Sequence, residues 1–321
     1  MNILNNRYLL LGFKLIVFLL MSWFIAEQLF LKNDFMKEVE VFFDHYQHDN
    51  NYLFFIAVLL MPVNWLLEAV KWNQLLKRKF PLPQLLKSIL AGIALGFVTP
   101  GRGGEFIGRV MFLDEEDKAK AFYLSSIGGI AQTTATLMVG VICVYFWRGD
   151  AFLSAIALGL AIVWLLLYLR FDLLNRFISS NSFLQKYSLV IHQDELPDIS
   201  VQTTVLLLSF LRFGVYLSQY VLLLMFFGVG HDFFQLGVYS GVFLLAQTFS
   251  PLMPLFDFSF RGGSALVIFS GLLWDNTYQS PNTIAVLCSV TMVWLINLVI
   301  PAITGYFLIL KKKMVFNAIR G

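Results

Sequence analysis

The sequence predicts an all-α, polytopic integral membrane protein with about six full spans and two re-entrant or broken helical hairpins that form an inverted repeat. Three observations predict this fold class. First, 58% of the 321 residues are hydrophobic and only 13% are charged, about half the charged fraction of an average soluble domain. Second, the mean hydropathy is +0.74. Third, several apolar runs reach the roughly 20 residues that cross a bilayer. We therefore expect a single membrane domain over residues 1–321, with little room for a soluble enzyme.

Six apolar runs are long enough to be full spans. The first, residues 8–31, shows no convincing small-x-small cleavage site, so we expect a retained anchor helix over residues 1–31 instead of a signal peptide. The other five runs are residues 52–70, 121–146, 151–169, 201–228 and 283–310. Of these, 151–169 links the two halves of the chain.

Two further apolar regions are interrupted by polar residues. Residues 84–113 predict a short apolar helix, a Thr-Pro-Gly-Arg-Gly-Gly break and a second helix. Residues 233–275 predict a helix that stops at Pro251 and Pro254, a polar break that contains Asp257 and Arg261, and a second helix. Irregular backbone at membrane depth persists only where protein buries it or where it lines a wet cavity. Both breaks are therefore candidate parts of a functional site.

The distribution of Lys and Arg predicts the orientation of the chain. If the N-terminus is cytoplasmic and each interrupted region returns to its side of entry, 15 basic residues lie inside and three lie outside. Residues 52–146, with hairpin 84–113, then form a first repeat, and residues 201–310, with hairpin 233–275, form a second repeat of opposite orientation. Broken helices that meet near the midplane mark the substrate site in many transporters. The alternative is that both regions are kinked full spans, which would abolish the inverted symmetry. The inside residues are Arg7, Lys71, Lys77, Arg78, Lys79, Lys87, Lys118, Lys120, Arg170, Arg176, Lys186, Lys311, Lys312, Lys313 and Arg320, and the outside residues are Lys32, Lys37 and Arg148.

Charged residues in the two breaks form the candidate binding site. Charges within membrane segments are costly and usually face a bundle interior or a wet cavity. Arginine beside glycine at the start of a helix suits an anion, and the obvious anion in a membrane is a lipid phosphate. The alternative is that the arginines only pair with neighbouring carboxylates and hold the breaks in shape. The candidate substrate-binding residues are Arg102, Gly103, Glu105, Arg109, Asp257, Arg261 and Arg212.

Two polar stripes at helical spacing occur, one within the span 201–228 and one near the inner end of the span 52–70. One comprises Ser209, Arg212, Tyr216 and Gln219, and the other comprises Asn64, Glu68 and Lys71. A helix-packing network and a translocation path both explain such stripes, and we slightly favour packing.

Other site chemistries find little support in the sequence. His45 and His48 are expected in a solvated external loop, not in a metal site, since no third ligand lies nearby. Cys143 and Cys288 fall in apolar runs and are expected to be reduced. No nucleotide-binding loop or hydrolase motif occurs. We expect no cofactor, no metal, no catalytic residue that can be identified and no nucleic-acid partner.

Three segments resemble the transmembrane, flippase-like region of the lysylphosphatidylglycerol synthase family. They are TPGRGGEFIGR (99–109), NWLLEAVKW (64–72) and PLMPLFDFSFRGG (251–263). The resemblance would cover residues 1–315 and implies lipid handling in the bacterial cytoplasmic (inner) membrane. The distribution of Lys and Arg described above places both termini in the cytoplasm. We expect this chain to lack the soluble aminoacyltransferase domain of the two-part members. Two departures are that Arg261-Gly262-Gly263 has no following Glu, and that residues 126–134 (SIGGIAQTT) lack a Glu-Arg pair.

These observations predict a flippase-like protein that translocates an anionic phospholipid or lipid-linked headgroup between leaflets, in which Arg102 and Arg261 bind the phosphate. The alternative is a membrane-embedded transferase that acts on a lipid-phosphate or polyprenyl-phosphate donor, with Glu105 as base. A third interpretation is a non-transporting membrane partner of a synthase.

Overall fold

The computed structural model describes residues 3–32, 35–45, 51–76, 79–99, 102–113, 118–170, 197–250, 252–269 and 283–320. Within these ranges every regular element is a helix, which confirms the all-α class. The elements are α1 (Ile3–Ala26), η1 (Glu27–Lys32), α2 (Phe35–His45), α3 (Asn51–Leu75), α4 (Leu82–Phe97), α5 (Gly104–Met111), α6 (Lys118–Arg148), α7 (Ala151–Leu169), α10 (Ile199–Phe226), α11 (Phe233–Thr248), α12 (Asp257–Phe269), α13 (Thr283–Trp294), η6 (Leu295–Val299) and α14 (Ile300–Arg320).

The predicted full spans are confirmed. In the described part of the chain, six helical segments are long and apolar enough to cross a membrane. Each overlaps one predicted run, and α13, η6 and α14 together form the last of them. Large apolar side chains remain exposed along these helices, for example Phe152 and Leu160 of α7. Such a surface is what a lipid environment accommodates.

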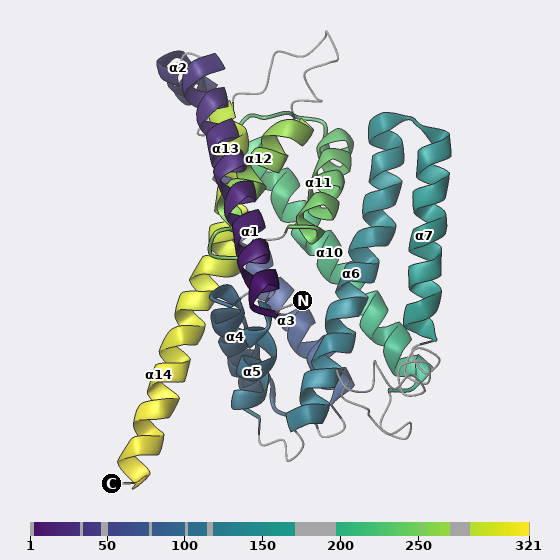
Figure 1. The fold of residues 1–321 in the computed structure, drawn as a ribbon, viewed down its shortest axis with the longest axis vertical. Helices are drawn as coiled ribbons and strands as arrows, with labels where there is room; N and C mark the ends of the chain where they lie inside the picture. The colour runs from purple at the N-terminus through teal and green to yellow at the C-terminus, as the bar shows by residue number, and fades with distance from the viewer. Residues whose placement is uncertain are drawn as a thin grey trace.

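Each interrupted region is a helix, a break and a second helix, as predicted. Helix α4 follows Pro81 and has proline in its first turn, where the missing N–H costs nothing. Its 16 residues extend about 24 Å, less than the roughly 30 Å hydrocarbon core. In Figure 1, α4 and α5 occupy the lower half of the molecule and α11 and α12 the upper half, among helices that run further along the long axis. The re-entrant interpretation of both hairpins stays a prediction.

Glycines set the closest helix contacts around the first hairpin. A Cβ on Gly108 would meet the backbone of Ala91, so α5 can lie against α4 only with glycine there. A Cβ on Gly305 would meet the carbonyl of Leu90, where α14 crosses α4. Small residues that allow backbones to approach are the usual packing device between membrane helices.

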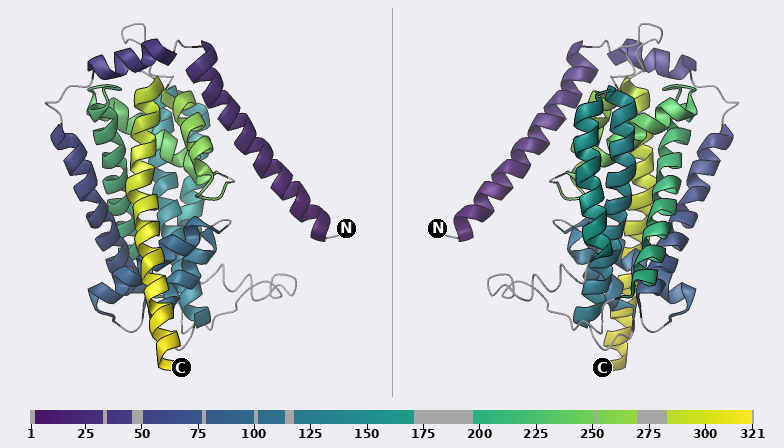
Figure 2. Two further views of the ribbon diagram at one scale, coloured as in Figure 1. Left: turned by 90° about the vertical axis from the view of Figure 1, so that its left-hand side faces the viewer. Right: turned by 90° about the vertical axis from the view of Figure 1, so that its right-hand side faces the viewer.

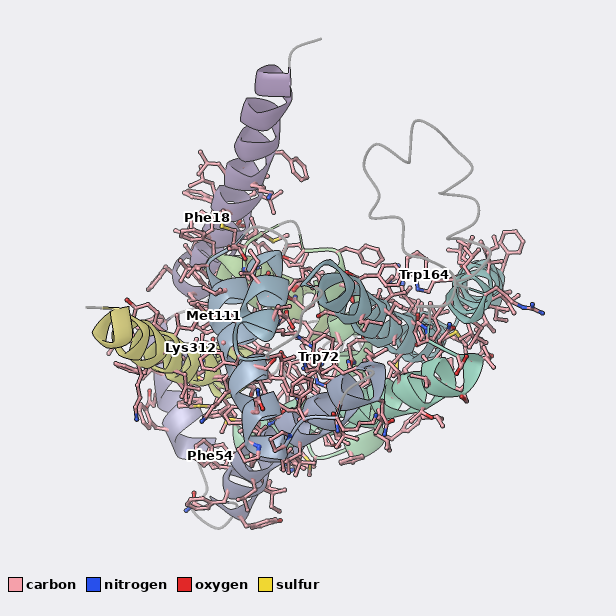
Figure 3. All side chains as sticks on the ribbon, turned by 90° about the horizontal axis from the view of Figure 1, so that it is seen from below. Phe18, Phe54, Trp72, Met111, Trp164 and Lys312 are labelled. Atoms are coloured by element: carbon pink, nitrogen blue, oxygen red, sulfur yellow. The ribbon has the colours of Figure 1, made fainter. Side chains whose placement is uncertain are left out.

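The buried apolar residues form two clusters, one around each hairpin. The lower cluster contains Ile89 and Val110 of the first hairpin, with Trp72 of α3. Trp72 lies amid the packed helices seen from below in Figure 3. The upper cluster contains Phe243 and Phe269 of the second hairpin. Each hairpin therefore packs against its own apolar cluster, and polar residues lie between the tips of the two hairpins.

The predicted external loop after the first span includes a helix, α2, which lies across the upper ends of the other helices (Figure 2). The ring of Phe42 stacks on Phe227 at 5.9 Å between centroids. The Glu38 carboxylate accepts a 2.8 Å hydrogen bond from the Thr283 backbone N–H at the start of α13. His45 is thus the last residue of a helix and not a loop residue, while His48 lies outside the described residues.

Helix α1 leans away from the bundle toward its N-terminus (Figure 2). Its second half packs on α12, where the side chains of Met21 and Ile25 lie over Gly263 and Gly262. The ring of Phe18 makes edge contacts with Phe256 and Phe258 near the second break. Gly262 and Gly263 therefore serve the packing of α12 against α1.

Candidate functional site

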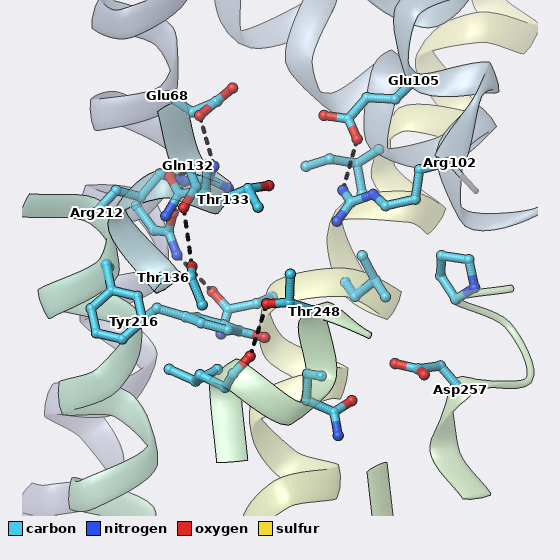
Figure 4. A pocket seen from close by; sticks show the side chains of 18 of the residues that line it. Glu68, Arg102, Glu105, Gln132, Thr133, Thr136, Arg212, Tyr216, Thr248 and Asp257 are labelled. Atoms are coloured by element: carbon cyan, nitrogen blue, oxygen red, sulfur yellow. Dashed lines mark hydrogen bonds and ion pairs between the residues drawn. The ribbon is translucent and has the colours of Figure 1, made fainter. Parts of the chain in front are cut away.

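A cavity of about 560 Å³ lies between the tips of the two hairpins (Figure 4). This volume is in the range of sites that bind small organic molecules. Helices α3, α4, α5, α6, α10, α11 and α12 contribute lining residues, as does η6. The charged lining residues are Glu68, Arg102, Glu105, Arg109, Arg212, Asp257 and Arg261.

The first break places Arg102 at the cavity rim in a strained backbone conformation. Its φ is 57°, in the left-handed region, which costs a non-glycine residue about 1–2 kcal/mol. The Thr99 Oγ1 accepts a 2.8 Å hydrogen bond from the Gly104 N–H and donates one of 2.8 Å to the Leu95 carbonyl, which fixes the turn into α5. The Arg102 side chain is 47% exposed. Observed strain in an exposed arginine is a reasonable indication of a functional position.

Glu105, in the first turn of α5, is shared by two arginines. Its Oε2 lies 2.9 Å from Nη2 of Arg102, and its Oε1 lies 2.5 Å from Nη2 of Arg109. Both carboxylate oxygens therefore have a guanidinium partner. The predicted pairing of Arg109 with Glu105 is present, and Arg109 also reaches α3.

Glu68 of α3 is the most connected charge in the site. Its carboxylate lies 2.7 Å from Lys71 Nζ, 2.6 Å from Arg109 Nη2 and 2.7 Å from Arg212 Nη1, and its side chain is 4% exposed. One buried carboxylate thus holds three cations from α3, α5 and α10. Lys71, which we assigned to the cytoplasmic segments, is in fact buried within this cluster.

Arg212 retains a donor for a ligand. Its Nε donates to Asn64 Oδ1 at 2.6 Å, and its Nη1 donates to Glu68 and, at 3.5 Å, to Gln132 Oε1. No described residue accepts a hydrogen bond from Nη2, and the side chain is 27% exposed. Figure 4 shows Arg212 and Arg102 on opposite sides of the cavity.

The two predicted stripes contact each other. In each stripe, some side chains pack against neighbouring helices and others face the cavity. Ser209 and Gln219 are buried, and Gln219 donates a 2.8 Å hydrogen bond to the Ala57 carbonyl of α3. Arg212 and Tyr216 face the cavity. Packing alone, the interpretation we slightly favoured, therefore describes only part of each stripe.

The second break differs from its predicted geometry. Asp257 is the first residue of α12 and Arg261 lies one turn inside that helix, not in the break before it. Arg261 donates to Asp257 Oδ2 at 2.8 Å and to the Tyr220 hydroxyl at 2.7 Å, and its side chain is 11% exposed. The Ser250 hydroxyl donates to the other Asp257 oxygen at 2.5 Å. Arg261 is therefore held on the wall of the cavity by Asp257 and Tyr220, while its buried Nε has no hydrogen-bond partner among the described residues.

The two hairpins contain ion pairs of the same spacing. Glu105 and Arg109 form an i,i+4 ion pair in α5, and Asp257 and Arg261 form an i,i+4 ion pair in α12. Each pair follows a break that begins with Thr-Pro or Ser-Pro in the sequence. By this spacing Arg261 resembles Arg109 more than Arg102. No Glu follows Arg261, but Asp257, one helical turn before it, is its carboxylate partner.

Six of the seven predicted site residues line this one cavity, and Gly103, the residue before α5, is not among the lining residues. Sequence analysis did not include the uncharged polar lining among the site residues, although Asn64 and Tyr216 belong to the two predicted stripes. These residues lie in apolar runs, where one amide or hydroxyl gives a weak signal. They are Asn64, Gln132, Thr133, Thr136, Tyr216, Gln247, Thr248, Ser250 and Asn297.

The cavity carries an excess of positive charge. Four arginines and three carboxylates line it, and Lys71 is buried beside Glu68. A buried charge needs a partner, so the arrangement suits an anion. In the described part of the chain no three His, Cys, Asp or Glu side chains group as metal ligands, and Cys143 and Cys288 are both free thiols.

Comparison with known proteins gives one family match. The model of the family described as "Lysylphosphatidylglycerol synthase TM region" matches residues 13–264, more than half of the chain. Its range contains the first hairpin, the second hairpin as far as Ser264, and every charged residue of the cavity. A search of curated proteins found no match.

Proposed function

Because the chain belongs to the family of the lysylphosphatidylglycerol synthase TM region, we propose that it binds the anionic headgroup of a membrane lipid in the central cavity and moves that lipid between leaflets. A multi-pass membrane protein with a lipid-related role follows from the family and the six apolar helices. Translocation is the further step, and the observation that supports it is the cationic cavity between the hairpin tips.

The contacts support a division of labour among the arginines. Arg102 and Arg212 are the more exposed pair, with side chains 47% and 27% exposed. Arg109 and Arg261 are buried against carboxylates. We assign phosphate contact to the first pair and positioning of the hairpins to the second. Direct contact between Arg261 and the phosphate stays a prediction, and the burial of the Arg261 side chain makes that contact less favourable.

The placement of the hairpins supports the inverted-repeat proposal. Two hairpins with equivalent acid–arginine pairs approach one cavity from opposite halves of the molecule (Figure 1). In transporters of this kind, one half rocks against the other around a fixed site. Under this proposal both chain ends are cytoplasmic, in the inner membrane of a bacterium, and the positive-inside bias supports that orientation.

The ion pairs of Glu105 favour the transferase alternative less than they favour translocation. A general base needs a carboxylate oxygen that is free to take a proton, whereas both Glu105 oxygens are held by guanidinium groups. A membrane synthase that makes the transported lipid remains a proposed partner, and stable co-purification would reveal it.

Leaflet exchange by purified protein in liposomes tests the proposal. The vesicles carry reporter-labelled phosphatidylglycerol or labelled phosphatidylcholine, and the variants are Arg102→Ala, Arg212→Ala and the control Arg148→Ala. Arg148 is exposed at the end of α6, beside Trp147. Loss of a hydrogen bond to a charged group costs about 1.5–3 kcal/mol, which corresponds to roughly 10- to 100-fold weaker binding.

We expect faster exchange of phosphatidylglycerol than of phosphatidylcholine, loss of that preference in both cavity variants, and normal exchange in Arg148→Ala. Equal exchange of both lipids by all four proteins would contradict the anion site. Absence of exchange with retained lipid binding would favour a binding or partner role over translocation.

A further inference from the structure

Hydroxyl and amide groups occupy the part of the cavity between Arg212 and Arg102. Figure 4 shows Thr133 and Thr136 of α6, and Thr248 of α11, in this region. Together with Gln247 they form what we term the acceptor wall. A phosphate bound by the arginines alone would leave this wall without a partner.

The three threonines present oxygen lone pairs. Their hydroxyls donate to the carbonyl four residues earlier, at 3.2 Å for Thr133, 3.0 Å for Thr136 and 3.2 Å for Thr248. A hydroxyl has one proton and two acceptor lone pairs. Because each proton is used within its own helix, each oxygen is available to accept a hydrogen bond from a ligand.

Gln247 adds an amide oxygen whose orientation the neighbouring residues fix. Its Nε2 donates to Ser264 Oγ at 2.7 Å, and the Ser264 hydroxyl in turn donates to the Phe260 carbonyl at 2.7 Å. Since the serine proton is already used, reversing the amide would place two acceptors together. The Gln247 Oε1 is buried, and no described residue donates to it.

Volume and charge restrict the group that would meet these acceptors. A cavity of about 560 Å³ exceeds the need of a phosphate alone. An ammonium group would also satisfy acceptors, but four arginines face three carboxylates here, so a cationic headgroup is repelled. The remaining donors of suitable chemistry are neutral hydroxyls.

We infer that the headgroup is a phosphodiester that carries several hydroxyl groups, of sugar or inositol size. Arg102 and Arg212 hold the phosphate, and the acceptor wall accepts hydrogen bonds from the ring hydroxyls. This inference rests on the proposed function and specifies the class of lipid within it.

A series of lipids with one negative charge and different headgroups tests the inference. Purified full-length protein in detergent is titrated with phosphatidylinositol, phosphatidylglycerol, phosphatidylmethanol and zwitterionic phosphatidylcholine, and thermal stabilisation is measured. Phosphatidylmethanol keeps the phosphodiester charge and lacks headgroup hydroxyls. We expect half-maximal stabilisation by phosphatidylinositol at an at least about threefold lower concentration than by phosphatidylmethanol, because each neutral hydrogen bond contributes modestly.

The double variant Thr133→Val/Thr136→Val should lose the preference for phosphatidylinositol over phosphatidylmethanol and keep the preference for phosphatidylmethanol over phosphatidylcholine. The control is Thr304→Val on α14, whose hydroxyl also donates to the carbonyl four residues earlier, at 2.9 Å, on an exposed face outside the cavity. If the double variant does not fold, the lipid series with the native protein decides. Equal binding of phosphatidylinositol and phosphatidylmethanol, both above phosphatidylcholine, would overturn the inference and leave the proposed function standing. No preference over phosphatidylcholine would overturn both.

Discussion

Replacing Glu68 with Gln tests whether one buried carboxylate holds the site together. In the native protein, Glu68 forms ion pairs with Lys71, Arg109 and Arg212 at 2.6–2.7 Å. Glutamine has nearly the same shape but no charge, so Glu68→Gln removes the ion-pair partner of two buried cations, Lys71 and Arg109, and of the partly exposed Arg212. Of these three, Arg109 keeps Glu105 as a second carboxylate partner. Removal of one partner of a buried ion pair typically costs about 3–5 kcal/mol.

The two free cysteines provide the assay. Cys143 is buried and Cys288 is half-buried, so a thiol-reactive fluorescent dye reports unfolding as the detergent-solubilised protein is heated. Because the unfolding entropy is about 2.1 cal/mol/K per residue, a change of 1 kcal/mol shifts the Tm of a 321-residue chain by roughly 1.5 °C. For a loss of about 3 kcal/mol, we expect Glu68→Gln to lower Tm by roughly 4–5 °C.

A compensating substitution makes the charge argument specific. Lys71→Met removes one of the three cations and keeps an apolar stem in place of the Lys71 chain. In Glu68→Gln/Lys71→Met the net charge of the cluster returns to its native value, so the double variant should be more stable than Glu68→Gln. Coupling of this kind is expected between residues in one network. A Tm for Glu68→Gln within 2 °C of native, or additive losses in the double variant, would refute the electrostatic account.

Three further outcomes follow from backbone contacts and single hydrogen bonds. Gly108→Ala should destabilise the protein by about 1–3 kcal/mol, because its Cβ would meet the backbone of α4, whereas Gly159→Ala in α7, with no described atom within 4 Å of its Cβ, should be neutral or stabilising by thermal unfolding. Tyr220→Phe removes the hydroxyl that accepts from Arg261 and should cost about 1–3 kcal/mol; unchanged thermal stability would show that Asp257 alone holds this arginine. Arg102→Gly and Arg102→Ala both remove the charge, but the glycine variant should be more stable by about 1 kcal/mol because φ is 57°, and the reverse order would contradict the left-handed conformation.

The sequence by itself determined the long apolar helices and the positions of the two breaks, but not α2, whose residues were expected in a loop. A span of about 20 apolar residues has few alternatives to a helix in a membrane, because every backbone polar group must be paired within the segment. The same reasoning located the breaks at Thr99 and Ser250, since proline and glycine interrupt the apolar pattern there. Charges at membrane depth are rare, and the sequence therefore identified six of the charged residues that line the cavity.

Only the tertiary structure decided how these charges pair. Glu68 and Arg212 are 144 residues apart, and helical spacing within α3 or α10 contains no information on which faces meet across the bundle. The same limitation led to the pairing of Arg102 with Arg261, which are both next to glycine in the sequence. The structure instead relates Arg109 to Arg261 through i,i+4 carboxylates, and it assigns Gly262 and Gly263 to the contact with α1. Local pattern determines what each segment is, whereas partners across helices depend on the packing of the whole chain.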